Sequence, residues 1–274
     1  SATQTVTLLP GAATRLGINT AAAGVVNAVA FTAQPKIEIQ DADGNVVTGS
    51  TAQVDVALIG SGATLAGTAS KAAVAGLATY SGLKLTGTIG SYTLRYTATG
   101  LTGIDSPITL TFGAADHLGI ETGATGITNR VAFTTQPVIS VLDVSGNRVT
   151  NSTNDITVAS SAGNGAVLSG VKTVTPTSGL STFSGLKLTG PVGDYTLTYS
   201  ATGLTSASET VTLGFGAVTQ LVITTEPVGG NAAGDALTTQ PVVKIQDADG
   251  NKVMPANAQI QMSSARSEER RVGK

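Results

Sequence analysis

The sequence predicts an all-β protein built from tandem antiparallel β-sandwiches of about seven strands each. Three observations predict this fold class: the composition, a repeat of about 103 residues, and a two-residue alternation of apolar and polar side chains inside each repeat. Hydrophobic residues make up 41% of the chain and charged residues only 12%, with 34 glycines and neither cysteine nor tryptophan. Such a composition is typical of many short strands separated by turns.

The repeat is visible in three segments that recur at nearly constant spacing. They are FTAQP at 31–35, which returns as FTTQP at 133–137 and LTTQP at 237–241; SGLKLTG at 81–87, which returns unchanged at 184–190; and SYTLRYTATGLT at 91–102, which returns as DYTLTYSATGLT at 194–205. A fixed period of this length indicates a tandem array of structural modules.

The period sets the expected boundaries of the modules. We predict that residues 1–12 form the last strand of a preceding repeat, 13–115 repeat one, 116–218 repeat two, and 219–265 a truncated repeat three. The last nine residues, RSEERRVGK at 266–274, resemble the translation of a sequencing adapter and are interpreted as an artefact. Because two or three strands without a packing partner are marginal in water, we expect repeat three to be open.

Within each repeat the apolar residues alternate with polar ones. In PKIEIQ, Ile37 and Ile39 point one way while the residues between them point the other. This period predicts half-buried antiparallel strands, near 14–19, 29–40, 52–59, 63–74, 77–86, 91–98 and 106–112. About seven short strands in about 100 residues predict an immunoglobulin-like sandwich, with Tyr92 and Tyr195 placed as tyrosine corners.

The aromatic residues recur completely from repeat one to repeat two. The five pairs are Phe31 and Phe133, Tyr80 and Phe183, Tyr92 and Tyr195, Tyr96 and Tyr199, and Phe112 and Phe215. Large side chains that recur in register indicate a core. We therefore expect all ten to be largely buried, which leaves none for a sugar-stacking platform.

Several motifs carry a family resemblance. DADGNVV at 41–47, followed by GLATYSGLKLTGTIGSYTLRYTATGL at 76–101, resembles the bacterial immunoglobulin-like repeats of invasin and intimin adhesins. The resemblance covers most of both complete repeats. It implies an immunoglobulin-like fold, an extracellular or cell-surface location in bacteria, and a structural or adhesive role. Related sandwiches also occur in secreted hydrolases, S-layer proteins and phage virions.

QDADGN occurs at 40–45 and again at 246–251, and two interpretations are open. Asp41, Asp43, Asp247 and Asp249 could begin calcium sites, or the segment could be a turn between strands. Calcium needs six to eight oxygen ligands, and repeat two has Ser145 in place of the second acid. Asp before Gly-Asn suits a turn. The turn is the favoured interpretation, so we expect no metal site and no other cofactor.

Three further candidates receive structural interpretations. GSGATLAG at 60–67 has a glycine spacing faintly like a dinucleotide loop, but no helix is expected after it. His117 is the single histidine, too little for a triad or a histidine metal site. Lys84 and Lys187 could form a Lys–Asn cross-link, but the strands at 106–112 and 209–215 contain no asparagine, so we expect solvent-facing lysines.

These observations predict a non-enzymatic structural or adhesive repeat array, a stalk or spacer of a bacterial cell-surface or secreted protein. The alternative is an accessory or glycan-binding module of a secreted polysaccharide-degrading enzyme; a phage decoration domain is a third reading. Neighbouring repeats of the same chain are the expected partners. A host or cell-surface protein or a glycan is a further possible partner, which the sequence does not identify. Without the tail at 266–274 the chain has 11 basic and 15 acidic residues, a net charge of −4, which argues against nucleic acid. No run of 18 apolar residues exists, so we expect no membrane insertion.

Overall fold

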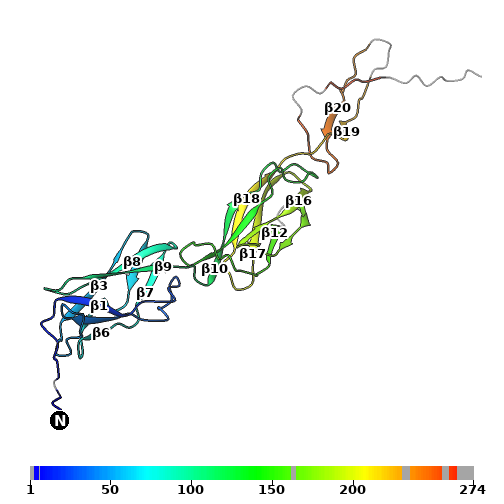
Figure 1. The fold of residues 1–274 in the computed structure, drawn as a ribbon. Helices are drawn as coiled ribbons and strands as arrows, with labels where there is room; N and C mark the ends of the chain where they lie inside the picture. The colour runs from blue at the N-terminus through cyan, green and yellow to red at the C-terminus, as the bar shows by residue number, and fades with distance from the viewer. Residues whose placement is uncertain (1–2, 6, 162–164, 230–234, 255–258, 264–274) are drawn as a thin grey trace, which may run out of the picture.

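The computed structural model describes residues 3–5, 7–161, 165–229, 235–254 and 259–263, and the regular elements in these ranges are all β-strands (Figure 1). The predicted all-β fold class is therefore confirmed. Within the described ranges no helix is long and apolar enough to cross a membrane. The predicted tail at 266–274 lies outside the described residues.

Repeat one contains nine strands in three antiparallel sheets. They are β1 (Arg15–Thr20), β2 (Lys36–Gln40), β3 (Gln53–Ile59), β4 (Ala63–Ala66), β5 (Ser70–Ala72), β6 (Leu77–Thr79), β7 (Lys84–Gly87), β8 (Gly90–Thr97) and β9 (Ile104–Leu110). The sheets have the orders β1-β2-β6, β5-β3-β8-β9 and β4-β7. The apolar faces of all three sheets contribute to one core, which includes Leu85 of β7.

The described part of repeat two reproduces this arrangement strand for strand. Its strands are β10 (Ala115–Thr122), β11 (Val138–Asp143), β12 (Ile156–Ser160), β13 (Val167–Val171), β14 (Thr173–Val174), β15 (Leu180–Thr182), β16 (Ser184–Thr189), β17 (Gly193–Ser200) and β18 (Ala207–Leu213). The sheets are β10-β11-β15, β14-β12-β17-β18 and β13-β16. Figure 1 shows the two sandwiches end to end along the chain.

Repeats one and two each have nine strands in the described ranges where about seven were expected, because the segments predicted at 63–74 and 77–86 each divide between two sheets. The segment predicted at 63–74 forms β4, which pairs with β7, and β5, which pairs with β3. Gly67 has a φ of +109°, and a Cβ there would lie 2.5 Å from the carbonyl oxygen of Gly82. This close backbone crossing, which only glycine permits, lets the chain change sheets.

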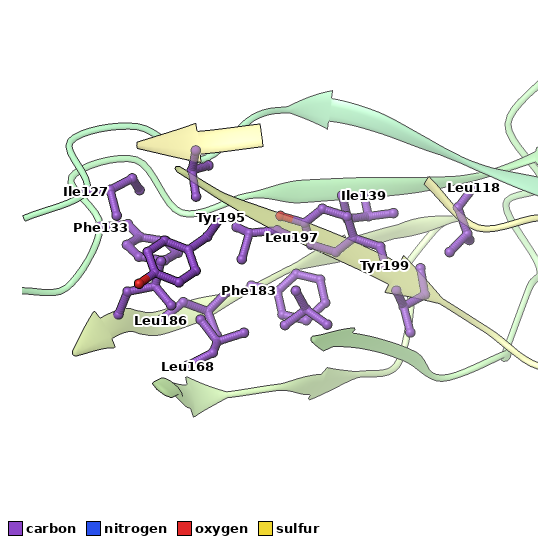
Figure 2. Close-up of a cluster of buried hydrophobic side chains, with 14 of the residues drawn as sticks. Leu118, Ile127, Phe133, Ile139, Leu168, Phe183, Leu186, Tyr195, Leu197 and Tyr199 are labelled. Carbon is purple, nitrogen blue, oxygen red and sulfur yellow. The ribbon is translucent and has the colours of Figure 1, made fainter. Parts of the chain in front are cut away.

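Four of the five aromatic pairs are buried, as predicted. The ring centroids of Tyr80 and Tyr96 are 5.8 Å apart, and those of Phe183 and Tyr199 are 5.7 Å apart in the equivalent place. Figure 2 shows the second core, with these two side chains between the strands. Tyr92 also donates a hydrogen bond to the carbonyl of Thr88, four residues upstream, as expected for a tyrosine corner.

The fifth aromatic pair departs from the prediction. Phe112 is half-buried and packs against the core of repeat two rather than that of repeat one. Its equivalent Phe215 is 45% exposed. Both follow the last strand of their repeat, in the connection to the next one. The sequence placed them in a core because recurrence does not reveal which neighbouring core a side chain enters.

The predicted third repeat contributes one two-stranded sheet to the described structure, β19 (Gln220–Thr225) and β20 (Val242–Gln246). Its apolar residues are largely uncovered: Leu221 is 57% and Ile223 51% exposed. We expect limited proteolysis to trim the chain rapidly to a stable fragment that ends near Val218, because so small a sheet buries too little surface to offset its chain entropy. Equal protection through Met262 would contradict this expectation and the predicted truncation.

Candidate functional site at the joint between repeats

Three equivalent turns follow β2, β11 and β20, and each begins with a buried aspartate. These residues are Asp41, Asp143 and Asp247, at most 3% exposed. In the second turn, Oδ1 of Asp143 accepts hydrogen bonds from the backbone N–H of Ser145 at 2.9 Å and of Asn147 at 3.0 Å. The other two turns have the same pair of bonds. The aspartate thus closes the turn, as the sequence predicted.

The second carboxylate oxygen of Asp143 faces repeat one. Oδ2 accepts a hydrogen bond from the backbone N–H of Gly113 at 2.8 Å and another from Nδ2 of Asn27, also at 2.8 Å. Gly113 lies in the short connection between β9 and β10, and Asn27 lies in the loop between β1 and β2. One carboxylate therefore binds its own turn, the connection and the preceding sandwich together.

Asn147, at the end of the same turn, makes the second set of contacts across the joint. Its Oδ1 accepts a hydrogen bond from the N–H of Ile89 at 3.0 Å, and its Nδ2 donates one to the carbonyl of Gly87 at 2.8 Å. Gly87 and Ile89 belong to the hairpin between β7 and β8. Because both groups of one amide bind one hairpin, the asparagine fixes rotation as well as distance at the joint. We call the Asp143, Asn147, Asn27 and Gly113 set the joint latch.

The latch recurs at the next joint with the same geometry. Asp247 accepts hydrogen bonds from Asn129 at 2.9 Å and from the N–H of Gly216 at 2.9 Å. Asn251 binds the N–H of Val192 at 2.9 Å and the carbonyl of Gly190 at 3.0 Å. The N–H of Gly11 also donates to Asp41 at 2.8 Å. Recurrence at fixed register makes the latch a property of the repeat.

The second joint adds an ion pair that the first lacks. The guanidinium of Arg130 donates to both carboxylate oxygens of Asp249, at 2.7 and 2.6 Å. The equivalent residues at the first joint are Ala28 and Ser145, whose side chains carry no charge. Asp249 is 17% exposed, and the bond from Arg130 holds the pKa of its carboxyl below the usual range.

The latch keeps its aspartates ionised. The pKa of Asp41 is lowered to about 2, chiefly by the hydrogen bond from the N–H of Gly11. Burial of Asp143 disfavours its charged form, but the hydrogen bonds from the Gly113 N–H and from the two asparagines outweigh burial and lower its pKa. The same balance lowers the pKa of Asp247. Each latch therefore contains a charged acceptor, which strengthens its hydrogen bonds.

We expect the joints to be stable at neutral pH and to weaken in acid. A carboxyl whose pKa is lowered by folding contributes stability that is present above the unfolded pKa, about 3.9, and is lost as the pH falls through the folded value. Loss should therefore begin near pH 4 and continue as the pH falls through the lowered pKa values of Asp143 and Asp247. Thermal melting of the full chain at a series of pH values checks this window. A loss that began above pH 5 would contradict it.

The predicted calcium candidates do not share one site. Asp43 and Asp249 contribute their N–H groups to Asp41 and Asp247 at 3.1 and 3.0 Å. The oxygens of Asp41 and Asp247 face N–H donors. In the described ranges no group of three or more histidine, cysteine, aspartate or glutamate residues could hold a metal ion.

We expect melting of the full chain in chelator and in millimolar calcium to agree within error. A ligand that binds the folded state alone stabilises it by several kcal/mol when it greatly exceeds its Kd. A rise of several degrees in calcium would instead make one of these turns or joints a metal site.

The remaining candidates lie where the sequence expected them. Lys84 and Lys187 are exposed on their strands. His117 is half-exposed beside Asp116, with Nδ1 at 3.0 Å from a carboxylate oxygen. Gly60 and Gly62 occupy the turn between β3 and β4, where Gly60 has a φ of +122°, and Gly67 follows β4.

The sequence did not reveal the residues that bind the turn aspartates across the joint. Asn27 and Asn129 stand 102 positions apart, the same step as the FTAQP segments, and Gly11, Gly113 and Gly216 recur with them. This recurrence was the available signal. It could not show that asparagines more than a hundred positions from the aspartates would bind them.

No protein-family model matches the chain, and no curated protein matches it. Among solved structures, the Escherichia coli adhesin FdeC is 16% identical, with 89% of this chain and 77% of FdeC covered and a TM-score of 0.44. InvD of Yersinia pseudotuberculosis is 20% identical, with coverages of 87% and 72% and a TM-score of 0.37.

A C-terminal fragment of intimin, solved with the intimin-binding domain of its receptor Tir, is 14% identical, with coverages of 80% and 69% and a TM-score of 0.28. Bacterial β-glycosidases are also similar, with TM-scores of 0.28 to 0.33, and the chain covers about a quarter of each. The structural neighbours of this chain thus include bacterial immunoglobulin-like adhesin domains and glycosidase domains.

Proposed function

We propose that the chain is a non-enzymatic array of tandem sandwiches, a stalk or spacer of a bacterial cell-surface or secreted protein. The observation that carries the proposal is the joint latch, repeated at both joints with the same bonds. An aspartate that binds its own turn, the connection and the neighbouring sandwich couples the orientation of one module to the next. A rigid series of modules holds whatever it carries at a set distance from its anchor.

The short connection supports the same function. Only four residues, 111–114, separate β9 from β10, and one of them, Gly113, is part of the latch. Phe112, also in this connection, packs against the second core. A connection this short, with residues bound to both sandwiches, limits bending between the two repeats.

The neighbouring repeats are the principal partners in this proposal. A host or cell-surface protein or a glycan is a further partner that a stalk could present or meet, and an extracellular bacterial location fits that role. The accessory-module alternative would need exposed aromatic side chains to stack on sugar rings. Tyr80 and Phe183 are each 1% exposed, whereas Phe215 is exposed at a joint.

Single-molecule pulling of the full chain tests the load-bearing role. We expect two unfolding events of similar force, each releasing roughly 30–35 nm of chain, since an extended residue spans about 3.3–3.6 Å. Extension without two such events would contradict a load-bearing array. Binding to a glycan array that is lost in Phe215→Ala would favour the accessory-module alternative.

A further inference from the structure

One pair of facing positions carries opposite charges at the second joint and no charge at the first. The residue after the joint asparagine is Ala28 in repeat one and Arg130 in repeat two. The third residue of the turn that faces it is Ser145 at the first joint and Asp249 at the second. Ser145 donates a hydrogen bond to Asn27 at 3.3 Å, whereas Asp249 receives both bonds of the Arg130 guanidinium. The first joint thus has two uncharged residues at these positions, Ala28 and Ser145. The second has a basic and an acidic residue, Arg130 and Asp249.

The backbone holds the two loop positions in the same way. Ala28 and Arg130 both have left-handed conformations, with φ of 61° and 66°. The N–H of Ala28 donates to the carbonyl of Leu85 at 2.8 Å, and that of Arg130 to Leu188 at 3.0 Å. A side chain placed at position 28 would therefore leave the backbone in the direction that Arg130 takes. The backbone at position 28 therefore suits an arginine as it does at position 130.

At the first turn of the chain, after β2, the surface that faces the preceding sandwich at the other two turns is exposed. Asp43 and Asn45 are exposed, whereas their equivalents at the other joints are half-buried or buried beneath the preceding sandwich. Leu8, Gly11 and Asp43 line a hollow of about 300 Å³ there, and the corresponding hollow of about 140 Å³ at the second joint has Asn129 and Arg130 in its wall.

We propose that these two positions favour particular repeat neighbours, and that Asp43 is the acidic half of a pair made with a sandwich carrying an Asn–Arg loop like that of repeat two. The inference rests on the proposed function, since it concerns the joints of a stalk. The occupant of the first turn is then a repeat of the type of repeat two. A loop of the type of repeat one, with Ala28, would leave Asp43 without its ionic partner.

Two matched chimeras test this inference. One joins a second copy of residues 116–215 to Gly11 of the chain, so that Arg130 of the copy faces Asp43. The other joins a second copy of 14–112, so that Ala28 of the copy faces it. In the first chimera a double-mutant cycle of R130A in the copy and D43A should give a coupling of about twofold to fivefold in the unfolding equilibrium. In the second, D43A should have no such effect.

Two outcomes overturn the inference and are distinguishable. The distance between the added copy and repeat one is measured in both chimeras by pulsed electron paramagnetic resonance with one spin label in each. Equal effects of D43A in both chimeras, together with a narrow distance distribution, would contradict the proposed pairing but not the proposed function as a stalk. Broad distance distributions in both chimeras would contradict both the proposed pairing and the proposed function. A control cycle uses Arg95 and Asp105, an exposed pair within repeat one at 2.7 Å, whose coupling should be the same in both chimeras.

Discussion

Replacing Asp143 by alanine is expected to lower the melting temperature of repeat two by roughly 12–24 °C. The carboxylate is fully buried, and its removal leaves buried donors of Asn27, Gly113 and the turn without an acceptor. Unsatisfied buried donors cost about 1–3 kcal/mol each, and the surroundings will relax in part, so we expect a total of about 3 kcal/mol. For a domain of this size 1 kcal/mol corresponds to about 4–8 °C. Calorimetry of the full chain measures the shift.

Three variants separate the two roles of this carboxylate. Asp143→Asn keeps one acceptor oxygen and should cost less than alanine. Asn27→Ala removes a contact across the joint, and also the acceptor of the Gly87 N–H within repeat one, but it leaves the turn of repeat two closed. It should therefore loosen the joint with a smaller change in the melting temperature of repeat two than Asp143→Ala. Asp105→Ala, which removes an exposed acid, should change little. An Asp143→Ala protein that melts like the wild type would show that the latch contributes nothing.

Replacing Gly170 by alanine is expected to destabilise repeat two by about 3 kcal/mol or more. Gly170 has a φ of +110°, which side chains rarely adopt, and a Cβ there would collide with the carbonyl of Gly185 on the crossing strand. Because the neighbour is backbone, it cannot move aside without disturbing the β13-β16 sheet. Gly67→Ala should act in the same way in repeat one. Denaturant unfolding of each variant gives the loss directly.

Gly203 provides the matched control. It also has a positive φ, +78°, but a Cβ there would meet nothing within 4 Å. Gly203→Ala should therefore cost only the backbone strain, about 1–2 kcal/mol. Equal losses at Gly170 and Gly203 would mean that the close crossing of the strands does not matter for stability.

The fold class could be predicted because its signals are local or periodic. Alternation such as that of Ile37 and Ile39 states which side of a strand is buried, and recurrence of Tyr96 as Tyr199 states that both belong to equivalent cores. The division of 63–74 between sheets could not be predicted in the same way. Alternation does not show which strand pairs with which. The change of partner strand depends on the close contact of Gly67 with Gly82, which lies on a different segment of the chain.

The turn could be predicted from Asp-x-x-Gly-Asn, but the joint could not. The bond from Asn27 to Asp143 joins residues 116 positions apart, and no property of either residue alone names the other. Phe112 shows the same limit, since its recurrence with Phe215 indicated burial but not the repeat that buries it. The contacts between modules depend on how whole sandwiches meet. The module boundaries themselves stay predictions.

The distance between repeats one and two tests most directly whether the latch sets their orientation. The chain lacks cysteine, so Thr68→Cys and Lys172→Cys, both at exposed positions, would carry two spin labels without background. Pulsed electron paramagnetic resonance should then give one narrow distance distribution at neutral pH, which broadens in Asp143→Ala. A broad distribution in the wild-type chain, or a narrow one that Asp143→Ala leaves unchanged, would contradict a joint held by this aspartate.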